Sequence, residues 1–226
     1  MRRERHIPTD PRDSVPHLKA EQNAPEALRS IKVLREALNE CRRCELWRQA
    51  TQGVPGEGMR HAPLMLVGEA PGDAEDREGH PFVGPAGALL NRALAQAGID
   101  RRQAYVTNAV KHFKFEPRGK RRLHSKPNAG EIKACRWWLS QEIELVAPKL
   151  IVALGATAAQ SLLGKAVTIA GTRGRPLQLG EHASLIVTVH PSYLLRIPEE
   201  VRKRAEYERF VKDLTMARTA LHAVRH

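Results

Sequence analysis

Apolar side chains recur along the chain with two different spacings, which predict strands that alternate with helices. Four short apolar runs, at residues 64–67, 105–106, 150–154 and 185–189, have the length and character of buried strands. Between these runs, apolar residues recur every three or four positions, as they do on one face of a helix. This second spacing predicts helices over residues 27–41, 86–97, 131–146 and 157–163, and a last helix that begins at Pro198.

The alternation of these elements indicates an α/β fold. Such chains form mainly parallel sheets covered on both faces, so we expect a three-layer α/β/α fold with a central, mainly parallel four-stranded sheet. A chain of 226 residues is long enough to bury its own core, and we expect a single domain over residues 25–226 and a monomer. Residues 1–24 are polar and basic, contain three prolines and show no apolar period, which predicts a flexible arm.

Polar residues and turns follow the predicted strands at their carboxyl ends. Glu69 follows the first strand, Asn108 ends the second, a turn at 155–157 follows the third, and His190 follows the fourth. In open parallel sheets, ligands bind outside the carboxyl ends of the strands. One polar residue at a strand end is more often a helix cap. Three at one sheet edge, two of them beside glycine or proline, predict a binding site.

The charge of the chain indicates a polyanionic partner. Lys and Arg number 37 against 25 Asp and Glu, so the net charge is +12 and the isoelectric point is about 10.1. Nucleic acid is the simplest such partner. No apolar run approaches the roughly 18 residues of a membrane span, and the first residues do not resemble a secretory signal. Three cysteines are too few for a disulfide framework, so we expect an intracellular, cytoplasmic protein with no membrane partner.

Positive charge is concentrated in residues 113–130, which contain six Lys or Arg residues and one acid. Pro117, Gly119 and Pro127 argue against a helix and predict a loop. A run of charges is often only a solvated face, but this loop directly follows a strand that ends at the predicted site. We therefore expect it to contact nucleic-acid phosphates, which supply affinity without sequence specificity. The candidate contacts are Lys120, Arg121, Lys126 and, after the fourth strand, Arg196.

Several motifs together resemble the uracil-DNA glycosylase superfamily, in its iron–sulfur family 4 branch. They are GEAPG at 68–72, HPFVGPAG at 80–87, VTN at 106–108 and VTVHPSYLLR at 187–196, and their order and spacing match over about residues 27–220. The segment KRRLH at 120–124 is similar to the KRRIH insertion of the UdgX subgroup, whose members attach covalently to the DNA they act on. The resemblance implies excision of uracil from DNA, with single-stranded DNA accepted.

The resemblance assigns a uracil pocket to residues near the first two strands. A base that is to be excised must first be flipped out of the stack into a pocket. Phe82, on a loop rich in Gly and Pro, is expected to stack on the base, and the Asn108 amide can both donate to and accept from the uracil edge. Taken alone, Phe82 could plug the core and Asn108 could turn the chain after a strand. Gly68, Ala70 and Asp73 complete the pocket that the resemblance implies.

Four residues receive catalytic roles from the resemblance. Glu69 acts as a general base or stabilises the cationic sugar, and His190 donates a hydrogen bond to the departing base. His124 is the nucleophile that traps the sugar, with Glu69 as its proton acceptor, and Arg122 holds the loop closed. Ala70 stands where UdgX relatives usually have Gln, whereas conventional family 4 enzymes have Ala or Gly. The alternatives are a conventional hydrolytic glycosylase and a catalytically silent iron–sulfur DNA-binding protein.

Three cysteines and a histidine form the candidate metal site. Cys41 and Cys44 have the C-x-x-C spacing, and Cys135 lies on a later predicted helix. Family 4 enzymes generally carry another cysteine shortly after the second strand, where this chain has His112, and imidazole can replace thiolate at iron. The resemblance thus implies a 4Fe–4S cluster, with a structural role, held by these four residues. A zinc ion would suit the same set of ligands.

Overall fold

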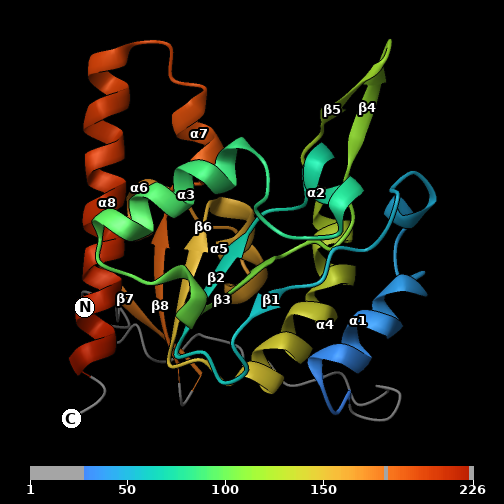
Figure 1. Cartoon of the computed structure of the whole chain (residues 1–226), viewed down its shortest axis with the longest axis horizontal. Coiled ribbons are helices and arrows are strands. Elements are labelled where there is room, and N and C mark those ends of the chain that lie inside the picture. The colour runs from blue at the N-terminus through green and yellow to red at the C-terminus, as the bar shows by residue number, and fades with distance from the viewer. Residues whose placement is uncertain (1–27, 181–182, 224–226) are drawn as a thin grey trace, which may run out of the picture.

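The computed structural model describes residues 28–180 and 183–223, and the arm predicted over residues 1–24 lies outside them. Within the described residues, a six-stranded sheet has the order β1-β3-β2-β6-β8-β7 (Figure 1). The α/β fold class is therefore confirmed. The strands span Glu57–Gly58 (β1), Leu64–Gly68 (β2), Ala104–Asn108 (β3), Leu150–Leu154 (β6), Pro176–Leu179 (β7) and Ala183–Thr188 (β8).

The four strands predicted from the apolar runs form the parallel centre of this sheet. β2 pairs in parallel with β3 on one side and with β6 on the other, and β6 pairs in parallel with β8. The expected number of four strands is wrong, because β1 and β7 add antiparallel edges. β1 has only two residues and β7 is only partly buried, so neither forms the continuous apolar run of a strand covered on both faces.

Helices cover both faces of the sheet (Figure 1). Side chains alternate between the two faces along each strand, so Leu66 and Met65 enter different apolar clusters. The Leu66 cluster includes α3 (Pro85–Gln96) and α8 (Glu200–Ala223). The Met65 cluster includes α4 (Ala129–Val146) and α5 (Ala156–Leu163), and α1 (Ile31–Asn39) packs against α4. Of the helices in the described ranges, none is both long enough and apolar enough to cross a membrane.

Helix ends follow capping groups more closely than the apolar period. α1 begins after Ser30, whose hydroxyl accepts a hydrogen bond from the Val33 amide, and it ends before the two cysteines of the C-x-x-C pair. α8 begins at Glu200 and not at Pro198, because the Glu199 carbonyl accepts the first helical hydrogen bond. The apolar period did not indicate the short helices α2 (Asp73–Glu78), α6 (Ile169–Thr172) and α7 (Pro191–Leu195), or the 3-10 turns Glu45–Arg48 and Arg101–Gln103.

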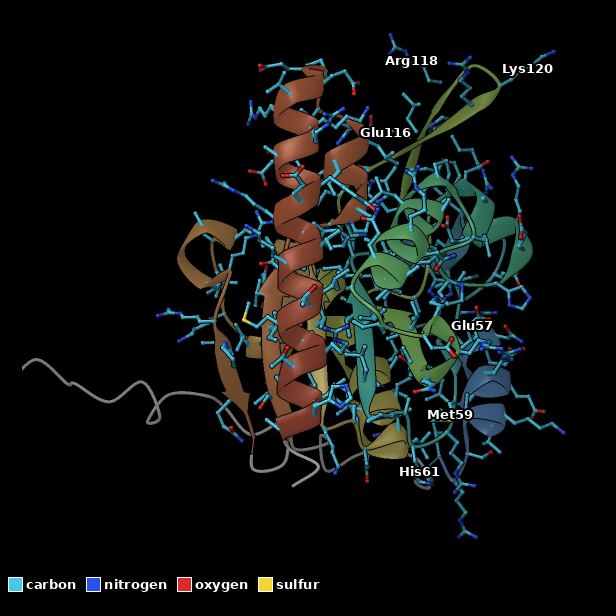
Figure 2. The ribbon with its side chains drawn as sticks, turned by 60° about the vertical axis from the view of Figure 1, so that its left-hand side comes forward. Glu57, Met59, His61, Glu116, Arg118 and Lys120 are labelled. Carbon is cyan, nitrogen blue, oxygen red and sulfur yellow. The ribbon has the colours of Figure 1, made fainter. Side chains whose placement is uncertain are left out.

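The basic segment contains a β-hairpin, which corrects the expectation of a loop. β4 (Phe115–Arg118) and β5 (Arg121–His124) pair antiparallel around Gly119, whose φ of 59° suits a tight turn. Pro117 disfavours a helix but is tolerated in β4, because both outer edges of a two-stranded ribbon are free. The hairpin stands out beyond the sheet (Figure 1), and Figure 2 shows Arg118 and Lys120 near its tip, directed away from the rest of the protein.

Candidate active site

A cavity of about 790 Å³ opens at the carboxyl ends of the parallel strands. Because β3, β2, β6 and β8 are neighbours in that order, the residues that follow them reach the same edge of the sheet. Asn108, Glu69 and His190 therefore line one cavity, and its volume is typical of small-molecule pockets. Six further residues singled out in the sequence also line it: Ala70, Asp73, Phe82, His124, Lys126 and Arg196.

Gly68 lies in close contact with two side chains that line the cavity, Phe82 and Asn108. The Phe82 backbone has a left-handed φ of 59°, which is uncommon for a residue with a side chain, and its ring stacks on His190 with centroids 5.9 Å apart. Gly68 pairs with Asn108 in the sheet. A β-carbon on Gly68 would lie 2.6 Å from the Phe82 ring and closer still to the Asn108 amide oxygen. The glycine thus allows an aromatic face and an amide to meet at the end of β2.

A buried carboxylate that sequence reasoning did not identify braces the loop of Phe82. Glu75, on α2, accepts hydrogen bonds from the amides of Gly72 (3.1 Å) and Gly84 (3.0 Å). It therefore joins the segment after β2 to the loop that carries the ring. An acidic residue in a short polar helix gives no local sign that it is buried, because its burial depends on the packing of that loop.

The start of α7 holds the His190 ring in one tautomer. Its Nδ1 accepts a hydrogen bond from the Ser192 amide (3.1 Å) and lies 2.8 Å from the Ser192 hydroxyl. Because an amide N–H can only donate, Nδ1 carries no hydrogen, and the neutral ring carries its hydrogen on Nε2. Burial, together with the nearby His124 and Arg196, lowers the pKa of His190 to about 4, so the ring is neutral at pH 7.

The two carboxylate oxygens of Glu69 face different partners. Oε2 accepts a short hydrogen bond from the hydroxyl of Thr157, which is buried at the start of α5. Oε1 lies 3.7 Å from Nε2 of His124, the last residue of β5. Thr157 belongs to the turn noted in the sequence at 155–157, but no sequence signal connected it with Glu69. The arrangement brings a carboxylate and an imidazole together from distant parts of the chain.

Arg122 fastens the hairpin to α2. Its Nε lies 2.5 Å from Asp73 Oδ1, and its Nη1 lies 2.7 Å from Oδ2 of the buried Asp76. The guanidinium also lies over the Phe115 ring, 5.1 Å from its centroid. Hydrogen bonds from Arg77 and Arg122 lower the pKa of the Asp73 carboxyl. Arg122 is thus outside the cavity lining, in a position to hold the hairpin over the cavity.

The predicted DNA contacts separate into two groups. Lys126 and Arg196 line the cavity. Arg121 and His124 are three positions apart on one strand, so they project from opposite faces of the hairpin. Lys120 lies in the exposed turn (Figure 2). Arg121 and Lys120 are therefore outside the cavity lining, and their contact with DNA stays a prediction.

The three cysteines contribute to one apolar cluster that includes α1 and α4 residues. Cys41 and Cys135 are buried within the cluster, and the partly buried Cys44 packs against it. The Cys135 sulfur accepts a hydrogen bond from the Lys111 amide, and the Cys41 sulfur accepts one from the Trp138 indole, both at 3.1 Å. In the part of the chain that the structure describes, no three His, Cys, Asp or Glu side chains are grouped to hold one metal ion.

His112 supplies a further donor next to Lys111 in the chain. It is buried, and its Nδ1 has no hydrogen-bond partner among the described residues. Burial lowers the pKa of His112 to about 4, which leaves the ring in the neutral form that binds metals, and burial raises the pKa of the Cys135 thiol to about 12. Three cysteine sulfurs and one neutral imidazole nitrogen are donor types that fit iron and zinc equally.

Comparison with known proteins relates the chain to one superfamily. Residues 55–215, which include every residue that lines the cavity, match the family described as the uracil DNA glycosylase superfamily. The type-4 uracil-DNA glycosylase of Thermotoga maritima is 40% identical over 167 residues, 74% of this chain and 83% of that protein. The type-4 enzyme of Pyrobaculum aerophilum is 36% identical over 193 residues, 82% and 92% of the two chains. That of Archaeoglobus fulgidus is 35% identical over 189 residues, 80% and 89%.

Proposed function

Because this chain belongs to the uracil-DNA glycosylase superfamily, we propose that it removes uracil from DNA and becomes covalently linked, through His124, to the sugar that is left. One observation carries the covalent step: His124 Nε2 lies 3.7 Å from Glu69 Oε1 at the cavity. The reaction divides into recognition of the base, departure of the base and capture of the sugar.

Recognition uses a stacking face and an amide. A flipped uracil would stack on Phe82, whose loop is braced by Glu75. The Asn108 amide offers both a donor and an acceptor to the uracil edge. Cytosine carries an amino group where uracil has a carbonyl, so it would leave a buried mismatch with the amide. Lys126 and Arg196, which line the cavity, would hold the flanking phosphates.

Departure of the base uses His190 and Glu69. As the glycosidic bond lengthens, its electron pair moves onto uracil and the sugar becomes cationic. The Nε2–H group of His190 can donate a hydrogen bond to the developing anion without giving up its proton, and the ring is neutral because its pKa is about 4. The Glu69 carboxylate stabilises the positive charge on the sugar.

Capture of the sugar needs a base that accepts the His124 proton and a leaving group that takes the electron pair of the broken bond. In the tautomer with hydrogen on Nε2, His124 gives this proton to Glu69, and the freed lone pair of Nε2 forms a bond to C1′. The electron pair of the broken C1′–N1 bond leaves with uracil, which takes up a proton from water. Arg122 holds the hairpin in place. A fixed group can then compete with water, because effective molarities reach about 10⁵ M for well-oriented groups.

A conventional hydrolytic glycosylase is the second candidate, and Ala70 favours it. Ala70 lines the cavity where UdgX relatives usually carry Gln. In the hydrolytic reaction, water attacks C1′ with Glu69 as the base, and His124 only contacts DNA. Recognition and departure are the same in the two candidates, which differ in the product.

A 4Fe–4S cluster would be held by Cys41, Cys44, His112 and Cys135. When bound, such a cluster supplies metal–ligand bonds that join the segment after α1 to α4 and to the segment after β3. The unpartnered Nδ1 of His112 supports this assignment. The purified protein should be brown and contain iron, and His112→Ala should lose iron. A colourless protein with stoichiometric zinc would overturn the cluster assignment.

One assay separates the possible functions. The protein is mixed with a molar excess of a uracil-containing single-stranded oligonucleotide, free uracil is measured, and a denaturing gel after heat and detergent detects an adduct. The covalent proposal expects uracil release and one DNA per protein in the adduct. Uracil release with repeated turnover and no adduct would establish the hydrolytic candidate. DNA binding with no uracil release would establish a catalytically silent protein.

The matched variant is His124→Ser, which removes the nucleophile and leaves space for water. It should release uracil and leave an alkali-labile abasic site without an adduct. After nuclease digestion of the wild-type adduct, peptide mass spectrometry should find a sugar-phosphate remnant on the peptide that contains His124. A remnant on a different residue would contradict the covalent proposal.

A further inference from the structure

The strand order of the sheet brings the start of α5 next to Glu69. β2 and β6 are neighbouring parallel strands, so Glu69, which follows β2, and residues 155–157, which follow β6, meet at the cavity edge. Gly155 makes the sharp turn from β6 into α5. Its φ is 96°, and a β-carbon there would lie 3.2 Å from Cβ of His190, so a residue with a side chain would fit poorly. α5 begins at Ala156, so Thr157 lies in its first turn.

The Thr157 hydroxyl constrains the orientation of the Glu69 side chain. A carboxylate can only accept, so the hydroxyl hydrogen is directed at Oε2. Thr157 is 1% exposed and branched at Cβ, so packing and restricted χ1 rotation hold the donor in place. With Oε2 occupied, Oε1 is the oxygen that faces His124, at 3.7 Å. The two oxygens of Glu69 are thus assigned to different tasks by one buried hydrogen bond.

We propose that Thr157 is a positioning residue, which holds Glu69 in the orientation needed at the sugar, whether His124 or water attacks. The inference rests on the proposed excision of uracil. Without the hydroxyl, the carboxylate can rotate and turn Oε1 away from the reacting atoms, and loss of orientation slows a reaction without weakening binding. Thr157 is not one of the described residues that line the cavity. Loss of its hydroxyl should therefore leave DNA affinity unchanged.

The test compares Thr157→Val with Thr157→Ser. Valine keeps the size and the branch at Cβ but has no hydroxyl, whereas serine keeps the hydroxyl. With protein in excess over uracil-containing single-stranded DNA, Thr157→Val should slow uracil release about 10- to 100-fold, as expected for loss of a hydrogen bond to a charged group. Thr157→Ser should restore most of the rate. Affinity for the same DNA with a 2′-fluoro sugar, which resists cleavage, should match the wild type in both variants.

Ser161→Ala is the matched control on the same helix. Ser161 is also 1% exposed, but within the described part of the chain its hydroxyl has no hydrogen-bond partner. Both Ser161→Ala and Thr157→Val therefore remove a buried hydroxyl from α5, but only Thr157→Val removes the hydrogen bond to Glu69. The control should release uracil at the wild-type rate.

A second background tests whether the effect is independent of the attacking group. In the His124→Ser background, where water attacks, Thr157→Val should slow uracil release by the same factor as it does in the wild type, because Glu69 acts in both reactions. The inference is overturned if the wild type releases uracil and Thr157→Val does so equally fast, or if DNA affinity falls in step with the rate. A wild-type protein that releases no uracil would overturn the proposed function itself, and this inference with it.

Discussion

At Gly68, the absence of a side chain allows the two groups proposed to bind uracil to approach each other. In Gly68→Ala, the new β-carbon would lie 2.6 Å from the Phe82 ring, so this ring or the Asn108 amide must move. We expect uracil release to slow by at least about 10-fold, because stacking and hydrogen bonding with the base are both disturbed. The measurement is the single-turnover rate of uracil release.

The control is Gly130→Ala, in the first turn of α4. There a β-carbon would meet only the side chain of Asn128, at 3.3 Å, so the rate should not change. A Gly68→Ala variant as fast as the wild type would show that uracil does not bind between Phe82 and Asn108.

The lowered pKa of His190 makes the folded state sensitive to acid. Its pKa is 6.5 in the unfolded chain and about 4 in the folded protein, so the unfolded state binds the proton first as the pH falls. Stability is therefore lost between about pH 6.5 and 4, and at pH 5 the loss from this group is about 2 kcal/mol. Chemical unfolding at pH 7 and pH 5 should show this loss in the wild type, and His190→Gln should lack it. A ring that titrates near pH 6.5 by NMR would refute the prediction.

At the scale of elements, a buried ion pair joins the end of β3 to α4. Lys111 Nζ lies 2.6 Å from Glu142 Oε2, and both side chains are 0% exposed. The ammonium also donates to the Thr107 hydroxyl (2.6 Å) and the Asn108 carbonyl (2.8 Å), while Glu142 Oε1 accepts from the Gly56 amide (2.8 Å). These contacts satisfy both charges, so neither partner can be lost alone without leaving the other buried and unpaired.

We expect Lys111→Met to lower the free energy of unfolding by about 3–5 kcal/mol, because it leaves the Glu142 carboxylate without its partner. Lys111→Met with Glu142→Gln should recover a large part of this loss, since the glutamine is neutral and its side-chain oxygen can still accept from Gly56. Chemical unfolding measures all three proteins. A double variant less stable than Lys111→Met would show that the uncompensated charge is not the cause.

At the scale of the whole molecule, the net charge is +12. Part of this positive charge lies on the hairpin, where Lys120 and Arg121 stand outside the cavity lining. Because phosphate contacts release counterions, DNA affinity should fall steeply as salt rises. Lys120→Gln and Arg121→Gln should each weaken binding at low salt and reduce the slope of log K against log salt by about 0.7 for a single strand. The control is Lys149→Gln, at the amino end of β6 and so at the opposite edge of the sheet. Equal slopes for all four proteins would exclude the hairpin from DNA binding.

The α/β fold and the central strands could be predicted from the sequence because they depend on local spacing. The runs at 64–67 and 150–154 are apolar throughout because both faces of those strands are covered, whatever packs on them. The meeting of the polar residues that follow these strands could also be predicted, since the carboxyl ends of parallel strands lie at one edge of the sheet. Edge strands were missed because β1 is too short, and β7 too exposed, to leave a continuous apolar run.

Contacts between distant residues were decided by the tertiary structure alone. Thr157 and Glu69 are 88 positions apart, and they meet only because β2 and β6 become neighbours. The resemblance gave Arg122 the role of holding the loop closed, but its partners on α2, Asp73 and Asp76, were decided by the pairing of the basic segment as a hairpin. The sequence by itself determined which residue types stand at the ends of the strands, because these are local properties of the chain. Strand order, register and burial decided which of them touch, because those depend on how the whole chain packs.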